Sequence, residues 1–164
     1  MKKLIEYIFE QEANYTIDDI SVYDVLKRIS KGNYKIIKDH IEEHEEIDDE
    51  FNILYVNGRN TSKNIYTNIE KNSPYQWIRL MNRNKEVAIQ LLKFEEKDII
   101  ELIILERSKF TKNEHDTFKK ILDQIIYKYN PKEIHTFALN DKLKQKYISY
   151  GFKLDNEDQL ILKL

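Results

Sequence analysis

The most constraining feature of this 164-residue sequence is a nearly continuous apolar run, IIELIILE, at residues 99–106. Successive side chains of a β-strand point to opposite faces of the sheet. A strand with one face in water alternates apolar and polar residues, and this run has too few polar positions for that pattern. The run therefore predicts a central strand covered on both faces, which requires further layers packed against its sheet.

The residues before this run have the pattern of a strand meander. We expect strands at residues 76–81 and 86–94, joined by a turn at 82–85, and a second turn at 95–98 leads into the central run. Connections this short join neighbouring antiparallel strands. The sequence thus predicts three antiparallel strands in sequential order.

An amphipathic helix is expected after the central run. Residues 112–129 carry apolar side chains at helical spacing, Thr111 with Glu114 fits a capping box, and Pro131 lies beyond the end. A strand at 133–139 completes a right-handed strand–helix–strand crossover, which makes the two strands parallel. The sheet-facing side of the helix is expected to consist of Phe118, Ile121, Leu122, Ile125 and Ile126.

The end of the chain adds a short helix at 141–150 and extended segments at 152–154 and 160–164. All these elements together predict an α/β (α+β) fold, with a mixed sheet that contains an antiparallel meander followed by a β-α-β crossover. We expect residues 1–50 to form a helical N-terminal segment packed on a core made by residues 51–164.

The N-terminal segment shows helical spacing at three places, and Gly32 is expected to end the second helix, at residues 22–29. The acidic run at 42–50 is interpreted as a solvated surface rather than a functional patch. A strand at 51–56 and a short helix within 60–74 are expected to follow.

The composition excludes several classes of function. The three glycines lie far apart, at Gly32, Gly58 and Gly151, so no glycine-rich nucleotide loop can be drawn. The chain has no cysteine, which excludes disulfides, iron–sulfur ligation and a cysteine nucleophile. A formal net charge of −2 argues against a nucleic-acid partner, although the sequence has 11 tyrosines.

Metal and membrane functions are not expected either. His40-Ile-Glu-Glu43-His44 has the spacing of an inverted zincin motif, but Glu is abundant around it and no third ligand can be identified. No apolar run approaches the ~20 residues of a membrane span. The N-terminus, MKKLIEYIFEQE, reaches acidic residues too early for a secretory signal, so we expect a cytoplasmic protein.

The segment from Asn140 to Phe152 resembles the C-terminal signature of the GNAT superfamily of N-acetyltransferases. In that family an Asn ends a strand, a Tyr lies seven residues further on, and Gly-Phe follows the helix. Asn140, Tyr147, Gly151 and Phe152 match all four positions. The order of strands and helices over residues 75–164 matches as well, so the resemblance implies a GNAT-like fold.

The resemblance also implies an activity, the acetyl-CoA-dependent acetylation of an amine on a small molecule or a protein. The pantetheine arm would enter between the two parallel strands and pair with backbone near Leu105, while Arg107 and Asn140 would contribute to cofactor binding. Tyr147 would protonate the thiolate leaving group, and Glu101 would accept the proton of the substrate ammonium group. No metal is implied.

Ordinary structural explanations remain open for both catalytic candidates. Tyr147 can be a packing residue whose hydroxyl is bonded to a carbonyl. Glu101 can be paired with Arg79 or Lys93 across the meander. Glu106, at the end of the central run, is a second candidate for the base.

His135, in the strand expected before Asn140, has two interpretations as well. It can line the acceptor cleft, and a hydrogen-bonded strand residue is the favoured interpretation.

One feature of the family is missing from this chain. The family carries a glycine-rich loop whose amides bind the CoA pyrophosphate, and residues 107–118 contain no glycine. Glu114 and Asp116 are expected in the first turn of the helix, where they would repel phosphates. The missing loop favours a non-catalytic binding or regulatory protein on a GNAT-like scaffold, and the signature favours the enzyme. The sequence does not identify the acceptor or the oligomeric state.

Overall fold

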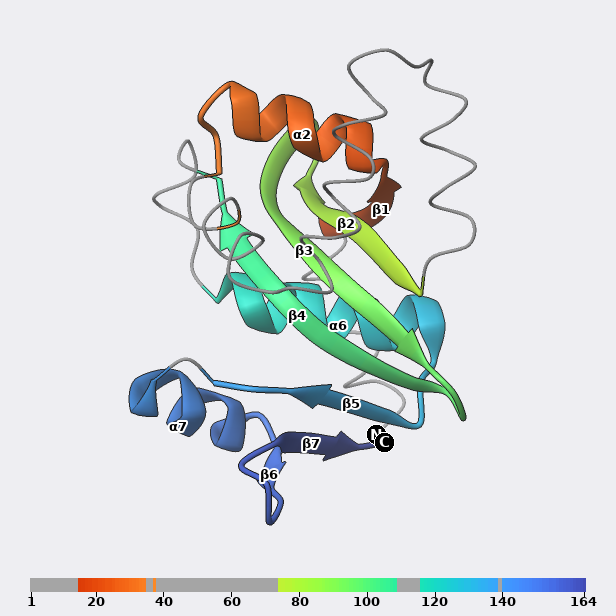
Figure 1. Cartoon of the computed structure of the whole chain (residues 1–164), viewed down its shortest axis with the longest axis vertical. Helices are drawn as coiled ribbons and strands as arrows, with labels where there is room; N and C mark the ends of the chain where they lie inside the picture. The colour runs from red at the N-terminus through yellow and green to blue at the C-terminus, as the bar shows by residue number, and fades with distance from the viewer. Residues whose placement is uncertain (1–14, 35–36, 38–73, 109–115, 139) are drawn as a thin grey trace.

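The computed structural model describes residues 15–34, 37, 74–108, 116–138 and 140–164. They contain the helices α2 (Val22–Ser30), α6 (Thr117–Tyr129) and α7 (Asp141–Ser149) (Figure 1). The seven strands form one mixed sheet in the order β1 (Tyr15–Ile20), β2 (Tyr75–Asn82), β3 (Lys85–Glu95), β4 (Ile99–Arg107), β5 (Glu133–Thr136), β7 (Leu160–Lys163) and β6 (Lys153–Leu154).

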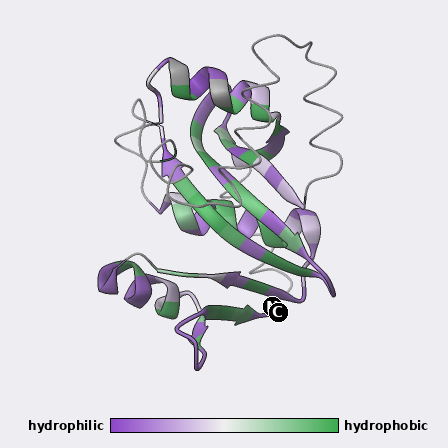
Figure 2. Cartoon of the chain, viewed as in Figure 1, coloured by the Kyte–Doolittle hydropathy of each residue, from purple (hydrophilic) through white to green (hydrophobic). Residues whose placement is uncertain are grey.

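The predicted meander is confirmed. Strands β2, β3 and β4 are antiparallel neighbours, and β4 lies in the middle of the sheet. The β2–β3 turn contains Arg83 at φ +57°, and the β3–β4 turn contains Lys97 and Asp98 at φ +63° and +62°. Figure 2 shows apolar residues along β3 and β4, as the continuous apolar run requires.

A β-bulge interrupts β4. Leu92 pairs with Leu102 and Leu91 pairs with Ile104, so Ile103 is an extra residue in β4. Leu102 therefore points into the core under α6, while Ile103 and Ile104 pack into the core on the other face of the sheet. A bulge bends its strand and increases the local twist. β4 consequently changes direction one residue after Leu102.

The predicted crossover through α6 is also confirmed, because β5 is parallel to β4. The pairing is short and extends only from Ile99↔Glu133 to Glu101↔His135. One further contact joins the strands, a 3.2 Å hydrogen bond that the hydroxyl of Thr136 donates to the carbonyl of Leu102. Beyond it the two ribbons diverge toward α7 (Figure 1).

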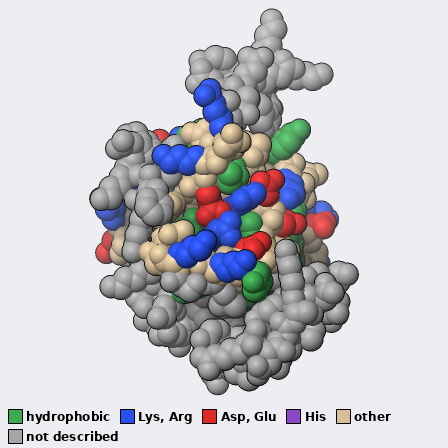
Figure 3. Space-filling model, turned by 90° about the horizontal axis from the view of Figure 1, so that it is seen from above, with side chains coloured by type: hydrophobic (Ala, Val, Ile, Leu, Met, Phe, Trp, Pro, Cys, Tyr) green, Lys and Arg blue, Asp and Glu red, His purple; other side chains and the backbone are tan. Residues whose placement is uncertain are grey.

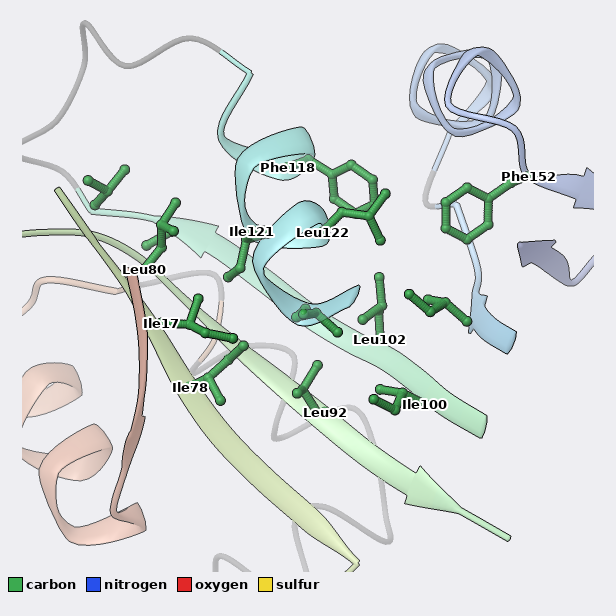
Figure 4. Packing of buried hydrophobic residues seen from close by; sticks show 14 of the residues in the cluster. Ile17, Ile78, Leu80, Leu92, Ile100, Leu102, Phe118, Ile121, Leu122 and Phe152 are labelled. Atoms are coloured by element: carbon green, nitrogen blue, oxygen red, sulfur yellow. The ribbon is translucent and has the colours of Figure 1, made fainter. Parts of the chain in front are cut away.

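The sheet has an apolar core on each face. Under α6, the predicted helix residues are buried together with residues of the sheet and Phe152 (Figure 4). Phe118, Ile121, Leu122 and Ile125 are at most 8% exposed, and Ile126 packs beside them. The opposite core contains residues of α2 together with Tyr34, Ile37 and Trp77.

Helix α2 is held on the sheet by partly buried polar contacts as well as apolar ones. Arg28 forms a two-pronged ion pair with Glu86 of β3, with nitrogen–oxygen distances of 2.9 Å, and the hydroxyl of Tyr34 donates to the same carboxylate at 2.9 Å. Burial and the negative charge of Glu86 raise the pKa of Tyr34.

The face seen in Figure 3 carries acidic and basic side chains side by side. No helix in the described part of the chain has the length and apolar character to cross a membrane.

Strand β1 was not predicted, because it lies in the segment expected to be helical. Ile17 and Ile20 are three residues apart, which is a helical spacing. In the extended strand this spacing places them on opposite faces, and each is buried in a different core. Helix α2 and its end near Gly32, at φ +77°, are as predicted. The expected elements at 1–14 and 38–73 lie outside the described residues.

The beginning of α6 is a second correction. The helix starts at Thr117 instead of residue 112, after Asp116 at φ +52° in the left-handed region. A residue in that conformation interrupts any preceding helical turn. The proposed capping box at Thr111 and Glu114 therefore does not begin α6, and both residues lie outside the described part. Strand β5 is also shorter than predicted and ends at Thr136.

The fully buried position of Ile125 gives the first prediction. Replacing Ile125 by Ala is expected to lower the free energy of unfolding by about 2–5 kcal/mol, because the substitution leaves a cavity under the sheet. Urea unfolding followed by circular dichroism measures this difference. The control is Tyr127→Ala in the same helix, at a position that is 69% exposed. Equal effects of the two substitutions would contradict the assigned helix face.

Candidate active site

The divergence of β4 and β5 defines the candidate site. In the described residues, the register pairs of β4 with β5 end at Glu101, although β4 continues to Arg107. Buried backbone N–H and C=O groups need hydrogen-bond partners. An extended ligand that enters between two separated strands supplies such partners in the way an added strand does. Leu105, proposed from the sequence as a cofactor contact, lies in this part of β4 and packs against the α6 core.

The beginning of α6 shares a core with this segment, because Phe118 and Leu105 belong to the same apolar cluster. The side chain of Asp116 makes no capping hydrogen bond, and the first turn contains no acidic residue. The first N–H groups of a helix have no intrahelical partner and attract anions. The hydroxyl of Thr117 is buried and has no hydrogen-bond partner. Arg107 lies exposed at the end of β4, and the rest of the glycine-free loop lies outside the described residues.

The four signature residues together shape helix α7. The side-chain oxygen of Asn140 caps the helix by accepting a 2.9 Å hydrogen bond from the N–H of Leu143. Gly151 has φ +104°, and a Cβ there would lie 3.3 Å from Leu162 Cδ1. Phe152 is 1% exposed and anchors the following segment in the core. The signature thus fixes both ends of the helix that carries Tyr147.

Tyr147 combines a packed ring with a free hydroxyl. Its ring centroid lies 4.5 Å from that of Phe118 and 5.8 Å from that of Phe152. Its hydroxyl makes no hydrogen bond to any described residue, so the carbonyl contact of the ordinary structural explanation is not observed there. Burial, with a smaller contribution from Tyr150, raises the pKa of Tyr147. The phenol therefore stays protonated at neutral pH, as a proton donor must.

Glu101 lies at the last register pair of β4 with β5. Its neighbours Ile100 and Leu102 point toward α6, so its own side chain lies on the opposite face. Burial raises the pKa of Glu101, and hydrogen bonding and charge repulsion with Glu95 raise it further. Lys93, directly across in β3, and His135 lower it. The net increase suits a group that must accept a proton near neutral pH.

The two alternative partners of Glu101, Arg79 and Lys93, lie at different parts of the sheet. Arg79 lies 3.5 Å from Asp18 and 4.0 Å from Glu86, which places it at another part of the sheet. Lys93 is the cross-strand neighbour of Glu101, as one alternative expected, and its ammonium also lies 3.5 Å from Glu95.

Glu106 makes a structural contact with the backbone on the other face of the sheet. One of its carboxylate oxygens accepts a 3.1 Å hydrogen bond from the backbone N–H of Ile37.

His135 was interpreted from the sequence as a hydrogen-bonded strand residue. Its Nε2 atom is instead buried without a hydrogen bond, 3.7 Å from a carboxylate oxygen of Glu133. His135 lies directly across from Glu101. The register of β4 with β5, which the sequence does not give, places the two side chains on the same face of neighbouring strands. The motif at His40 and His44 lies outside the described residues.

Known structures share this architecture. No protein-family model matches the sequence, and no curated protein matches it either. The chain has the fold of the GNAT N-acetyltransferases. A mutant of spermidine N-acetyltransferase SpeG from Vibrio cholerae superposes with a TM-score of 0.57 at 12% identity, covering 92% of this chain and 94% of that one.

Two other similar structures were solved with a cofactor bound. PaiA N-acetyltransferase from Thermoplasma acidophilum, in complex with coenzyme A, has a TM-score of 0.55 at 17% identity, and 92% of this chain and 99% of that chain are covered. N-acetyltransferase PseH from Campylobacter jejuni, in complex with acetyl coenzyme A, has a TM-score of 0.54 at 11% identity, and 92% and 97% are covered.

The cap of α7 gives the second prediction. Asn140→Ala is expected to lower the free energy of unfolding by about 0.5–2 kcal/mol, because the first turn loses its side-chain acceptor. Asn140→Asp keeps an acceptor oxygen and is expected to retain most of the stability. Denaturant titration of both variants measures the difference. Equal losses in Ala and Asp variants would show that the cap is not what Asn140 contributes.

Proposed function

We propose that this protein is an acetyl-CoA-dependent N-acetyltransferase that acts on an amine. The observation that carries the proposal is the early end of β4–β5 pairing, beside the free first turn of α6 and the free hydroxyl of Tyr147. The fold is shared with N-acetyltransferases solved in complex with coenzyme A and acetyl coenzyme A, which supports the same cofactor here.

The residues present fit such a cofactor. The backbone of β4 near Leu105 offers partners to an extended, amide-containing arm, and the first turn of α6 offers N–H groups to a pyrophosphate. The unpartnered hydroxyl of Thr117 lies in that turn. Arg107 adds a positive charge at the end of β4, and the side-chain amide nitrogen of Asn140 is left for a ligand because only its oxygen is used in the cap. When bound, acetyl-CoA supplies the activated acetyl thioester.

The helix boundary weakens the case for a non-catalytic scaffold. That case rested on the missing glycine-rich loop and on Glu114 and Asp116 within the first turn of the helix, and the helix boundary changes only the second of these grounds. The first turn of α6 has the sequence TFKK and contains no acidic residue, and Asp116 precedes it. One negative charge still lies at the cap position, so we expect it to weaken pyrophosphate binding without preventing it.

Glu101 and Tyr147 divide the proton transfers of the reaction. Glu101 takes a proton from the substrate ammonium group, which leaves a neutral amine with a lone pair. The amine nitrogen then forms a bond to the acetyl carbon, and the carbon–sulfur bond breaks. Tyr147 donates its phenolic proton to the departing sulfur and recovers it from the second N–H proton of the amine. The net products are an amide, a thiol and the proton held by Glu101.

The third prediction tests the proton donor. Tyr147→Phe removes the hydroxyl and keeps the ring that packs on Phe118 and Phe152. With thiol release measured over a panel of amines, kcat is expected to fall by roughly 10²-fold or more, the loss typical of a missing general acid. Acetyl-CoA affinity, measured by calorimetry, is expected to stay unchanged. Unchanged kcat would remove Tyr147 from the mechanism, and no binding of acetyl-CoA by the wild type would overturn the proposed function.

The fourth prediction tests the cofactor position. Asp116→Asn removes a negative charge at the cap of α6 while keeping a residue type that tolerates positive φ. CoA affinity is expected to rise by about 0.3–1 kcal/mol, the value of one charge at an exposed helix end. The matched control is Asp98→Asn, another exposed residue at positive φ, in the β3–β4 turn at the opposite end of β4. Equal effects of both substitutions would exclude pyrophosphate binding at α6.

A further inference from the structure

A row of ionisable side chains crosses three strands on the sheet face opposite α6. Lys93 of β3 pairs with Glu101 of β4, and Glu101 pairs with His135 of β5. Directly opposed side chains on neighbouring strands lie on the same face, and across the antiparallel pair of β3 with β4 their Cβ atoms are about 4.5–5.5 Å apart. Glu133 lies two residues before His135 and therefore on this face as well, and Glu95 lies diagonally from Glu101.

His135 occupies the middle of the acidic part of this row. Its side chain is 18% exposed, its Nε2 atom is buried without a hydrogen bond, and the oxygen of Glu133 lies 3.7 Å away. The Glu133 side chain is 29% exposed and reaches solvent. From β7, Ile161 is the register partner of His135 and contributes no charge. His135 is thus the register partner of Glu101 in β4 and lies 3.7 Å from the partly exposed carboxylate of Glu133.

We propose that His135 is a positioning residue that acts through Glu101, by relaying the proton of the acceptor amine from Glu101 to Glu133 and solvent. The inference rests on the proposed acetyl transfer. Imidazole suits such a relay because one ring nitrogen accepts a proton while the other donates one.

The proton balance of the reaction requires a route of this kind. Each turnover converts an ammonium group and a thioester into an amide and a thiol, with one proton in excess. That proton is left on Glu101, which must lose it before the next ammonium ion can be deprotonated. In the relay one ring nitrogen of His135 takes the proton from Glu101, the ring gives a proton to Glu133, and Glu133 gives it to water. No oxidant, reductant or further reactant is needed.

The first arm of the test examines the pair in the protein without substrate. The carboxyl carbon of Glu101 is followed by ¹³C NMR titration in the wild type and in His135→Gln, with Glu101→Gln used for assignment. Because His135 favours the ionised form of Glu101, its removal is expected to move the midpoint of Glu101 to higher pH. The Glu95→Gln variant is expected to move the midpoint in the opposite direction. No movement in His135→Gln would overturn the coupling on which the relay depends.

The second arm measures turnover as thiol release with acetyl-CoA and an amine panel in dilute buffer. His135→Gln is expected to lower kcat by roughly tenfold. Added imidazole is expected to restore the rate in His135→Gln and to leave Tyr147→Phe unrestored, which a merely structural role of His135 does not explain. An unchanged kcat, or a loss that imidazole does not restore, would overturn the relay and leave the acetyltransferase proposal intact. Absence of thiol release by the wild type would overturn the proposed function itself.

Discussion

Strand β4 pairs with β3 along one edge as far as Arg107, but its pairing with β5 along the other edge ends at Glu101. The rest of the candidate site depends on this early end of the β4–β5 pairing. The bulge at Ile103 turns the strand, while β5 pairs with β7 along its other edge from Glu133 to Thr136. The remaining backbone of β4 lies beside the beginning of α6, and the helix that follows β5 brings Tyr147 toward Phe118. A fully paired central strand of this apolar character would be only a structural element. Separation of its C-terminal half from β5 leaves a stretch of backbone that, in the proposed function, pairs with an extended ligand.

The sequence predicted the elements whose patterns are local. The apolar run at residues 99–106 and the apolar face of α6 are strong sequence signals, because a buried strand or helix face needs apolar side chains at fixed spacing. Strand β1 was missed because Ile17 and Ile20 serve two different cores, which mimics helical spacing. The start of α6 was not predicted because Asp116 adopts the left-handed conformation, and a non-glycine residue gives no sequence signal for that conformation. Helix boundaries are set by such single-residue conformations more than by periodicity.

The site was predictable to a different extent. The signature located α7 correctly, since Gly151 and Asn140 fix its ends by local geometry. Glu101 could be proposed from the sequence because a carboxylate inside an apolar run is unusual. The neighbours that raise and lower its pKa, Glu95 and His135, depend on the register of β3, β4 and β5. No short pattern in the sequence gives the register between two parallel strands that are far apart along the chain.

The surroundings of Glu101 favour the protonated form of its side chain. Its raised pKa means that folding disfavours the ionised form, so the contribution of this group to stability is fully present below its unfolded pKa. That contribution is lost as the pH rises through the folded pKa. Near neutral pH a glutamine at this position would relieve the repulsion from Glu95 without leaving a buried charge. Glu101 therefore contributes least to stability in the pH range in which its carboxylate is ionised.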